Sequence, residues 1–445
     1  MHDLKQLQRG ELAGIRRLDL AAGLTHFPDE IYALADTLEI LNLSGNRLER
    51  LPADLSRLHR LRILFCSDNA FDHLPECLGE CPNLEMIGFK ANRIEQLPAA
   101  ALPPALRWLI LTDNALTALP DELGRRPRLQ KLMLAGNRLG ALPDSLADCH
   151  NLELLRLAAN RLEHLPGWLP ELPRLAWLAF AGNPFSDRRE TRALAQAGHA
   201  SIDAADVRLH EVLGEGASGV IRRAEWHQGD GQHRAAAVKC FKGTVTSDGL
   251  PRSEMAACIA AGEHPHLLRV AGSLAGPGSP ALLMELLDPR FAALAQPPSL
   301  ASCTRDCYAP AQRFALAQVL KLARGTASAV AHLHGRGILH GDLYAHNLLV
   351  DPQGGCRLSD FGAASFFEPA AGTAPALQRL EARAFGVLLD ELLQRCDATI
   401  EDDEHLARLG ELRDRCLDLE PRRRPDFTAI EAHLATLRCT DMEER

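Results

Sequence analysis

Residues 340–362 read HGDLYAHNLLVDPQGGCRLSDFG, and three polar side chains in this stretch stand out by type and spacing. Asp342 is followed by Asn347 five residues later and by Asp360 after a further thirteen. A carboxylate can accept a proton and attract Mg²⁺, and an amide oxygen can bind Mg²⁺ without adding a full negative charge. The apolar run LLV between them predicts a short strand. The stretch therefore indicates a site suited to phosphoryl transfer.

A glycine-rich segment lies upstream of this stretch. Residues 207–226 read VRLHEVLGEGASGVIRRAEW, in which Gly214, Gly216 and Gly219 form a G-x-G-x-x-G arrangement. Such a loop lets backbone N–H groups approach phosphates, but dinucleotide-binding folds use the same spacing and continue into a helix. Here the next segment, AAAVKCFK, reads as a strand, with Lys239 twenty residues beyond Gly219. The loop therefore favours phosphoryl transfer over dinucleotide binding.

Taken in order, these motifs resemble the signature set of the protein kinase family: a glycine-rich loop, a V-A-V-K-type strand, a catalytic loop and an Asp-Phe-Gly triplet. The resemblance covers about residues 206–437. It implies that Lys239 holds the α- and β-phosphates of ATP and that Glu254, fifteen residues on, pairs with Lys239. The open alternative is that Glu254 is a solvated residue of its helix.

The same resemblance implies roles for the residues of the catalytic stretch and of the adenine pocket. Asp342 would orient the acceptor hydroxyl and take its proton, while Asn347 and Asp360 would bind Mg²⁺. Met284 would guard the back of the adenine pocket, and residues 285–287 would offer backbone groups to the adenine edge. The expected cofactors are therefore ATP and Mg²⁺. The residues expected to contact the nucleotide are Gly214, Glu215, Gly216, Ala217, Ser218, Gly219, Val220, Lys239, Glu254, Met284, Glu285 and Leu287.

Several positions depart from the kinase pattern. Gly341 stands where an arginine usually binds a phosphate on the activation loop, so control by phosphorylation of that loop is not expected. Tyr344 stands where a lysine usually neutralises the transferring phosphoryl group, an effect worth ~3 kcal/mol or more. His346 is a candidate replacement for that lysine. Glu381 stands in place of the aspartate that normally bonds the catalytic loop.

The segment after the Asp-Phe-Gly triplet is short. Only eighteen residues separate Gly362 from Glu381, and no Ala-Pro-Glu triplet lies among them. The glutamate with which Arg424 would pair in the resemblance is therefore missing. The platform on which protein kinases rest a peptide is shortened, which puts recognition of a peptide in doubt. Residues 289–308 also match no helix of the kinase pattern.

The first half of the chain is a repeat array. Residues 38–60 read LEILNLSGNRLERLPADLSRLHR, and residues 61–83 and 129–151 return the same pattern. One asparagine recurs at separations of 23, 23, 22, 23, 23 and 23 residues, and a proline follows all but the last of these asparagines by six. The asparagines are Asn46, Asn69, Asn92, Asn114, Asn137, Asn160 and Asn183.

The pattern L-x-x-L-x-L-x-x-N-x-L resembles the leucine-rich repeat and covers about residues 15–185. Leucines such as Leu41, Leu43 and Leu48 are expected in a core that successive units share, with the asparagines bonding backbone groups at each turn. The last repeat decays in residues 183–198, where an alanine-rich helix is expected to cap the core.

The strand positions that face away from this core are expected to form a concave surface rich in aromatic and methionine side chains. Exposed apolar area of that size invites burial by a partner, although scattered apolar side chains on a sheet are also common. We expect a protein substrate or partner there, or the second half of the same chain. The residues proposed for this surface are Phe65, Trp108, Ile110, Met133 and Trp177.

The composition narrows the class and compartment. The formal net charge of −9 and the pI near 6.1 argue against a nucleic-acid-binding surface spread over the 445 residues. The N-terminus lacks an apolar signal core, and no run reaches the ~18 apolar residues of a membrane helix. Most of the twelve cysteines stand singly and are not spaced as zinc ligands, which suits a reducing cytosol. We therefore expect a cytoplasmic protein that binds neither DNA nor RNA.

These observations predict a multidomain α/β chain with a leucine-rich repeat solenoid over residues 1–195, a linker over 196–206, and a two-lobed protein-kinase-like α+β domain over 207–440. The expected activity is that of an ATP-dependent protein kinase acting on serine or threonine, with the repeats recruiting substrate or governing the kinase domain. Two alternatives stay open. One is a scaffold whose kinase-like domain transfers nothing. The other is a small-molecule kinase, because H-G-D-L-x-x-x-N also resembles the catalytic loop of choline and aminoglycoside phosphotransferases.

Overall fold

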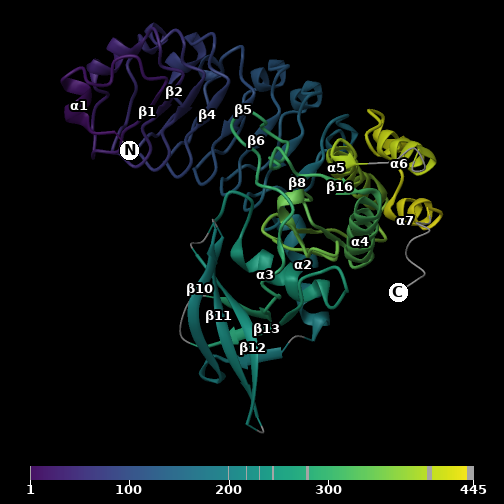
Figure 1. Ribbon diagram of the computed structural model, residues 1–445. Coiled ribbons are helices and arrows are strands. Elements are labelled where there is room, and N and C mark those ends of the chain that lie inside the picture. The colour runs from purple at the N-terminus through teal and green to yellow at the C-terminus, as the bar shows by residue number, and fades with distance from the viewer. Residues whose placement is uncertain are drawn as a thin grey trace. The chain divides into compact units, whose positions relative to one another are not determined.

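The computed structural model of the protein describes residues 2–198, 200–216, 218–229, 231–242, 245–276, 280–397 and 403–437 (Figure 1). The chain divides into two compact units, Met1–Leu172 and Pro173–Arg445. The first unit contains a repeat array, and the second contains a mixed sheet followed by a largely helical region. The predicted fold class, a repeat solenoid followed by a two-lobed α+β domain, is confirmed.

Short parallel strands build the sheet of the first unit (Figure 1). Each strand pairs in register with the next, so Ile40 lies beside Ile63 and Ile63 lies beside Met86. The strands are β1 (Arg17–Asp19), β2 (Ile40–Asn42), β3 (Ile63–Phe65), β4 (Met86–Gly88), β5 (Trp108–Ile110), β6 (Lys131–Met133) and β7 (Leu154–Arg156). The described helices of this unit are α1 (Leu4–Gln8) and the 3-10 helices η1 (Asp29–Leu34), η2 (Leu55–Arg57), η3 (Glu76–Glu80), η4 (Ala99–Ala101), η5 (Asp121–Arg125), η6 (Asp144–Asp148) and η7 (Leu169–Glu171).

The repeated leucines and asparagines hold successive turns together. Leu41, Leu43 and Leu48 are fully buried, as the repeat pattern predicts. The amide nitrogen of Asn46 donates to the carbonyls of Leu20 and Leu43, and its oxygen accepts from two backbone N–H groups of the preceding turn. The asparagines therefore supply hydrogen bonds to backbone groups that the irregular turns leave without a strand partner. This part of the prediction is confirmed.

The second unit begins with three elements that connect the last repeat to the mixed sheet. Strand β8 (Trp177–Ala179) is followed by helix α2 (Pro184–Ala197), the alanine-rich helix expected from the sequence. Asn183 caps the helix N-terminus with Ser186, and Gly198 ends it in the left-handed conformation at a φ of 57°. Strand β9 (Ala200–Asp203), within the expected linker, pairs in parallel with β13 (Val270–Ala275). A 3-10 turn, η8 (Ala204–Asp206), leads into the next strand.

The mixed sheet has the strand order β10-β11-β12-β14-β13-β9. Its further strands are β10 (Val207–Glu215), β11 (Gly219–Gln228), β12 (Gln232–Phe241) and β14 (Ala281–Glu285), and helix α3 (Pro251–Ala261) covers one face. Under α3, Phe241 and Met284 form a buried cluster with Ile259 of the helix. Val238 and Leu283 point to the other face, into a second cluster. The alternation along β12 and β14 thus gives the sheet two apolar faces.

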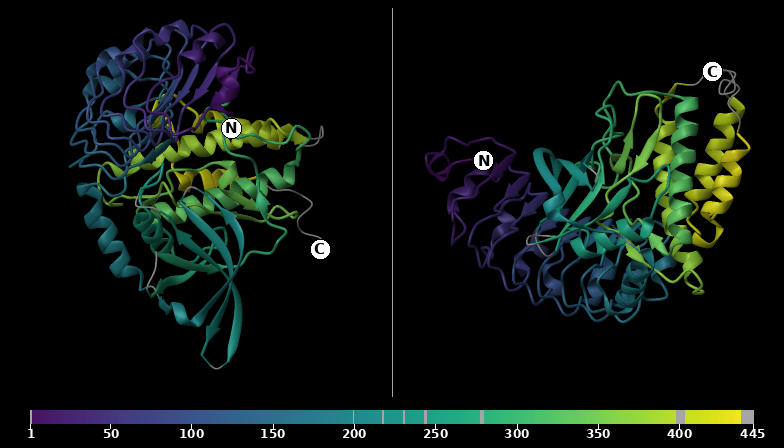
Figure 2. Two further views of the ribbon diagram at one scale, coloured as in Figure 1. Left: turned by 90° about the vertical axis from the view of Figure 1, so that its left-hand side faces the viewer. Right: turned by 90° about the horizontal axis from the view of Figure 1, so that it is seen from below.

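Helices α4 (Leu316–Gly335), α5 (Ala374–Leu393), α6 (Asp403–Cys416) and α7 (Phe427–Ala435) dominate the C-terminal region. Helix α4 contacts α5 and α7, and α5 contacts α6 (Figure 2). Among the described residues, this region also has the small sheets β15-β18-β19, β16-β21 and β17-β20. Their strands are β15 (Ala292–Ala293), β16 (Phe314–Ala315), β17 (Ile338–Leu339), β18 (Leu348–Val350), β19 (Cys356–Leu358), β20 (Ser365–Phe366) and β21 (Cys396–Asp397). The 3-10 turns are η9 (Ala345–Asn347) and η11 (Pro421–Arg423). Within the described ranges, no helix combines the length and apolar character needed to cross a membrane.

Candidate active site

Lys239 and Glu254 meet at the buried face of the mixed sheet. Lys239 lies on β12, Glu254 lies in the first turn of α3, and the lysine ammonium pairs with the glutamate carboxylate. Burial lowers the pKa of Lys239, but Glu254 and Asp360 outweigh it and leave that pKa raised. Burial, with a further contribution from Asp360, raises the pKa of Glu254 to about 7 despite the lysine. Glu254 is therefore an inward-facing residue and not a solvated one.

The glycine-rich segment forms the turn between β10 and β11. Gly214 and Glu215 end β10, and the N–H of Gly216 donates to the carbonyl of Gly219 at 2.9 Å. A side chain at Gly219 would collide with the carbonyl of Cys240 on β12, which accounts for glycine there. Ala217, one of the predicted nucleotide contacts, lies outside the described residues.

The neighbours of this turn lead back to Lys239. The carbonyl of Ser218 accepts from the N–H of Lys242 at 3.0 Å, and the Ser218 side chain lowers the pKa of Glu254. Val220 of β11 pairs with Cys240 of β12, and Cys240 directly follows Lys239 in the chain. The loop and the lysine are thus joined by continuous strand pairing.

The predicted adenine-edge residues lie at the end of β14. Met284 is buried and pairs with Ala237 of β12, whereas Glu285 and Leu287 are partly exposed. The Glu285 carboxylate accepts a hydrogen bond from the backbone N–H of Arg269 at 3.0 Å. No described contact singles out Leu287.

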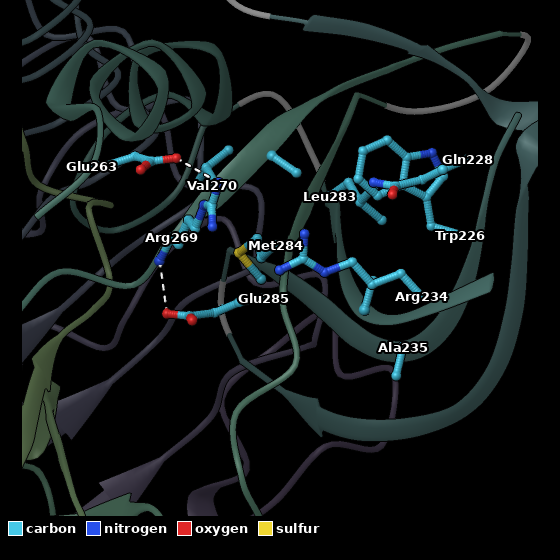
Figure 3. Close-up of a pocket in the computed structure, with 12 residues that line it drawn as sticks. Trp226, Gln228, Arg234, Ala235, Glu263, Arg269, Val270, Leu283, Met284 and Glu285 are labelled. Carbon is cyan, nitrogen blue, oxygen red and sulfur yellow. Dashed lines mark hydrogen bonds and ion pairs between the residues drawn. The ribbon is translucent and has the colours of Figure 1, made fainter. Parts of the chain in front are cut away.

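A cavity of about 200 Å³ touches the same strand end (Figure 3). Met284 and Glu285 form part of its wall, and Trp226, Arg234 and Arg269 surround the rest. Among the described residues, its lining includes neither the glycine-rich turn nor Lys239 nor Asp360. The cavity is therefore distinct from the place where the phosphate-binding residues converge.

Asp342 and Asn347 are in direct contact. The Asn347 amide nitrogen donates to the carbonyl of Asp342 at 2.9 Å and to its carboxylate at 2.8 Å. The carbonyl of Asn347 accepts from both the backbone N–H and the hydroxyl of Ser359, each at 2.9 Å. Because Ser359 precedes Asp360, these bonds tie the catalytic turn to the Asp-Phe-Gly triplet. Asp360 itself has a φ of +57°, which is unusual for a residue other than glycine.

His346 has a partner that the sequence did not indicate. Its Nδ1 lies 2.7 Å from Oδ1 of Asp306, its backbone N–H donates to Oδ2 at 3.0 Å, and its Nε2 lies 4.0 Å from Asp342. Burial lowers the pKa of His346, but the hydrogen bond to Asp306 and the charge of Asp342 outweigh it, so the pKa is raised. Asp306 belongs to the segment 289–308 that matched no kinase helix. No spacing signal links it to His346, forty residues away.

Glu381 bonds the catalytic loop, as expected from its position. One carboxylate oxygen accepts from the N–H of Gly341 at 2.6 Å, and the other lies 2.7 Å from Nε2 of His334. Gly341 has a φ of +74°, and a Cβ there would lie 2.5 Å from the carbonyl of Ala363 and 2.7 Å from that of Leu178. The arginine of the kinase pattern does not fit this position.

Tyr344, which replaces the usual lysine, lies against Trp177 of β8. The two rings stack with centroids 4.2 Å apart and planes inclined by 5°. Trp177 is only 1% exposed, and its Nε1 donates to the carbonyl of Leu343 at 3.0 Å. Trp177 is therefore not open to a separate protein partner; it contacts the second half of the chain, which is the alternative expected for this position. Phe65, Trp108 and Ile110 are partly exposed, while Met133 is buried.

Arg424 also bonds to the beginning of the second unit. Its Nη2 donates to the carbonyl of Pro173 at 2.6 Å, and its Nε donates to the carbonyl of Asp418 at 2.9 Å. Arg383 similarly donates to the carbonyl of Arg174 at 3.1 Å. Burial lowers the pKa of Arg424 to about 9. Backbone carbonyls thus occupy an arginine whose expected glutamate is missing from the sequence.

Comparison with known proteins matches both parts of the chain. Residues 207–376 match the profile of the protein tyrosine and serine/threonine kinase family. Residues 37–58, 104–162 and 127–185 match leucine-rich repeat profiles.

Individual relatives are similar over shorter stretches. The mitogen-activated protein kinase kinase kinase bck1 of Aspergillus fumigatus is 36% identical over 100 residues, which is 22% of this chain and 5% of the relative. Human ephrin type-B receptor 4 is 28% identical over 172 residues, 38% of this chain and 16% of the receptor. The probable inactive serine/threonine-protein kinase roco10 of Dictyostelium discoideum is 32% identical over 123 residues, 26% of this chain and 5% of the relative. The matched part is thus a small fraction of each relative.

Proposed function

Because the chain joins leucine-rich repeats to a protein kinase domain, we propose that it transfers the γ-phosphate of ATP to a protein hydroxyl, on serine or threonine. The observation that carries this proposal is the buried ion pair between Lys239 and Glu254, with the charge of Asp360 close enough to raise the pKa of the lysine. A lysine held in this way presents a fixed positive charge to the phosphates of a nucleotide.

The residues of the site divide the chemistry between them. Lys239 binds the α- and β-phosphates, and the backbone of residues 214–220 closes over them. Asp342 orients the acceptor hydroxyl and takes its proton, because the bond from Asn347 fixes one face of its carboxylate. Met284 backs the adenine ring, and Glu285 and Leu287 offer backbone groups to its edge.

The donor set near Asp360 fits Mg²⁺. Carboxylate and amide oxygens are the protein ligands that this ion prefers. The amide nitrogen of Asn347 is engaged by Asp342, which leaves the amide oxygen as the atom for a metal ion. One oxygen of Asp360 accepts from the N–H of Gly362 at 3.1 Å, which fixes the orientation of that carboxylate. Bound Mg²⁺ would neutralise charge on the β- and γ-phosphates.

The repeats supply recognition in this proposal. Leucine-rich repeat sheets present an extended surface to a protein partner. In the first unit, Phe65, Trp108 and Ile110 remain partly exposed on the strand face, and Trp108 carries the Lys131 ammonium 4.3 Å from its ring centroid. This face would bind the protein substrate or a partner that selects it.

A nucleotide-binding scaffold is the second candidate function. Tyr344 removes a lysine charge from the phosphoryl-transfer site, and the Dictyostelium relative is named a probable inactive kinase. The scaffold would bind ATP at Lys239 but transfer no phosphate.

The experiment is transfer of labelled phosphate from ATP with Mg²⁺, using protein acceptors, choline and aminoglycosides in parallel. Lys239→Ala and Asp342→Ala should each lower transfer by about 100-fold or more. Asp121→Asn, on an exposed turn of the repeats, is the matched carboxylate control and should leave transfer unchanged. Equal labelling by the wild type and both site variants would refute the assigned roles. ATP binding without transfer would favour the scaffold, and transfer only to small molecules would refute a protein substrate.

A further inference from the structure

The end of the repeat pattern is built into the kinase domain. We call the described residues of 173–203 the bridging segment; it comprises β8, α2 and β9. It touches the catalytic loop, helix α3 and the mixed sheet, which together carry the residues assigned to phosphoryl transfer (Figure 1).

The first contact is with the catalytic loop. Trp177 stacks on Tyr344 and bonds the carbonyl of Leu343, the residue directly after Asp342. A stacked aromatic pair of this kind adds a specific attraction to that of its buried area. Tyr344, which stands where kinases usually have a lysine, is therefore a residue of the catalytic loop that β8 contacts.

The second contact is with the shortened segment after the Asp-Phe-Gly triplet. The N–H of Phe180 donates to the hydroxyl of Ser365 at 2.8 Å, and Ser365 is fully buried. The carbonyl of Leu178 crowds the position where a Cβ of residue 341 would lie. The bridging segment thus fills the space that an arginine at position 341 would need. The buried hydroxyl of Ser365 is a fixed contact here and not a site open to a modifying enzyme.

The third contact is with helix α3, which carries Glu254. Leu194 packs against the cluster that contains Ile259 of α3 and Phe241 of β12. Asp187 forms an exposed ion pair with Arg252 at 3.5 Å. Helix α2 also reaches the opposite lobe, where Arg192 lies 3.6 Å from Glu368. One helix therefore contacts both the helix that positions Glu254 and the segment after β20.

We propose that the bridging segment is a positioning element of the phosphotransfer site. Trp177 holds the catalytic loop through Tyr344, and Leu194 holds Glu254 against Lys239 through α3. The site is thereby assembled by the end of the repeat array, in place of a phosphorylated activation segment. This inference rests on the proposed function, and the experiments below separate the two.

The test of Leu194 is a double-mutant cycle in the full chain. Leu194→Ala should lower kcat/KM for ATP about 10-fold in the wild type and less than about 2-fold when Glu254→Gln is already present. That non-additivity is expected only if Leu194 acts through Glu254. Gln196→Ala, an exposed change on the same helix, is the control and should have no effect. Equal losses in both backgrounds would overturn the role of Leu194.

The test of Trp177 is rescue by a conservative change. Trp177→Ala should lower kcat about 10-fold with an unchanged KM for ATP, because Trp177 reaches the catalytic loop and not the nucleotide. Trp177→Phe keeps a ring against Tyr344 and should restore most of kcat. Trp168→Ala, a partly exposed tryptophan of the first unit, is the control. An unchanged kcat in Trp177→Ala, or an equal loss in Trp177→Phe, would overturn the role of Trp177.

A failure of the proposed function gives a different pattern. If the wild type binds ATP but transfers no phosphate, phosphotransfer is refuted. The affinity for ATP, measured by calorimetry on Leu194→Ala, Glu254→Gln and the double variant, then replaces kcat/KM in the cycle. Non-additive affinities then support the positioning role, and additive ones overturn it. If the wild type does not bind ATP at all, both proposals are refuted.

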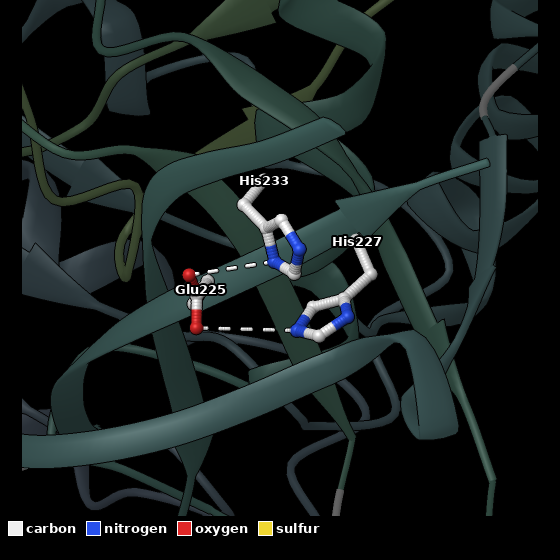
Figure 4. Close-up of side chains that lie close together, drawn as sticks. All are labelled: Glu225, His227 and His233. Atoms are coloured by element: carbon white, nitrogen blue, oxygen red, sulfur yellow. Dashed lines mark ion pairs between the residues drawn. The ribbon is translucent and has the colours of Figure 1, made fainter. Parts of the chain in front are cut away.

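A second inference rests on an independent cluster on the β11–β12 hairpin (Figure 4). His227 and His233 are directly opposite each other across the two strands, and Glu225 lies two residues before His227 on the same strand face. Nδ1 of His233 lies 3.4 Å from the Glu225 carboxylate, and Nε2 of His227 lies 4.0 Å from it. One ligand atom from each of the three residues can be chosen so that all lie within 4.8 Å of one another.

The geometry points to a binding site for a borderline divalent metal such as Zn²⁺. Zn–N and Zn–O bonds of about 2.0 to 2.2 Å place neighbouring ligand atoms roughly 3.3 Å apart. The 3.4 Å separation of His233 from Glu225 already meets this value, and small rotations of the two partly exposed imidazoles would bring the third ligand atom in from 4.0 Å. Two imidazoles with one carboxylate suit Zn²⁺ and not Mg²⁺, which prefers oxygen ligands. This site is separate from the Asn347 and Asp360 pair.

Calorimetric titration of the full chain with ZnCl₂, without nucleotide, tests this site. The wild type should bind one zinc ion that MgCl₂ does not displace, and His227→Asn or His233→Asn should weaken that binding at least about 10-fold. His150→Asn, an exposed histidine of the repeats, is the control and should not weaken it. Equal zinc affinity in the wild type and both hairpin variants would overturn the site, as would the absence of zinc binding.

Discussion

In the repeats, one asparagine per turn bonds the backbone of the turn before it, whereas in the second unit several buried polar side chains bond single partners far away in the chain. Asn46 and Asn137 donate to carbonyls that lie 26 residues earlier, in the same geometry. Trp177 instead bonds a carbonyl 166 residues away, and Arg424 bonds one 251 residues away. Loss of a periodic contact leaves the same contact intact in the neighbouring turns, whereas a single long-range contact has no copy elsewhere in the unit. The difference predicts which substitutions each unit tolerates.

The largest effect is expected at Glu381. Glu381→Ala removes a buried carboxylate that bonds Gly341 and His334, and each charge-assisted bond is worth about 1.5 to 3 kcal/mol. The free energy of unfolding of the second unit should fall by about 4 kcal/mol, measured by denaturant titration.

Two further variants make this a sharp test. Glu381→Asp, the residue of the kinase pattern, should lose about half as much because it reaches one partner and not both. Glu411→Ala, exposed on α6, should change stability by less than about 0.5 kcal/mol. A loss at Glu411 equal to that at Glu381 would show that the long-range bonds carry no special weight.

A comparable effect is expected at Gly341. Gly341→Ala places a Cβ against the carbonyls of Ala363 and Leu178 at a φ of +74° and should destabilise the chain by about 3 kcal/mol. Gly10→Ala isolates the backbone strain, because Gly10 has a φ of +72° with no atom within 4 Å of the added Cβ. It should cost about 1 kcal/mol. Equal losses in the two variants would mean that the carbonyls of Ala363 and Leu178 do not crowd a side chain at position 341.

Asn137→Ala tests how much the asparagine hydrogen bonds stabilise the repeats. This change removes bonds to the carbonyls of Leu111 and Leu134 and from the N–H of Leu116, all of them buried. The repeats should lose about 2 to 3 kcal/mol of stability, and hydrogen exchange should rise around residues 111–139 only. Asn151→Ala, which breaks one exposed bond to the carbonyl of Pro127, is the control. Faster exchange throughout the first unit would contradict a local role.

The smallest effect is a pH dependence at Glu391. Burial and the charge of Asp306 raise the pKa of this carboxyl to about 7, although Arg305 and the bond from Tyr308 oppose the rise. The Arg395 guanidinium donates to the backbone carbonyl of Glu391. Because the folded pKa exceeds the unfolded value of 4.5, the folded state holds this proton more tightly, and the stability it contributes is lost as pH rises from 4.5 to 7.

The measurement compares the wild type with Glu391→Gln. Between pH 5 and pH 7, the wild type should lose about 2 kcal/mol of unfolding free energy relative to the variant. Parallel pH profiles of the two proteins would show that Glu391 does not hold a proton in the folded state.

The sequence predicts the repeats well because every contact recurs at the same spacing. The burial of Leu41 and Leu43 and the bonds of Asn46 follow directly from the pattern. In the second unit, the order of the motifs predicts the pairing of Lys239 with Glu254, which the structure shows.

The remaining features of the site have no local signal in the sequence. Asp306 meets His346 only because residues 289–308 fold back through the β15–β18 pair. Trp177 occupies a strand position like that of Trp108, yet one ring is buried on the catalytic loop and the other is partly exposed. A position in the repeat pattern thus predicts that the residue lies on a strand, but not what its side chain contacts.

The asparagine ladder of the first unit has a consequence for how that unit comes apart. Each asparagine couples its own turn to the preceding one, so opening a turn costs only the bonds to its immediate neighbours. Such an array behaves as a one-dimensional chain of coupled units. Under a denaturant or a pulling force, the repeats should therefore open in a series of steps, each about one turn in size.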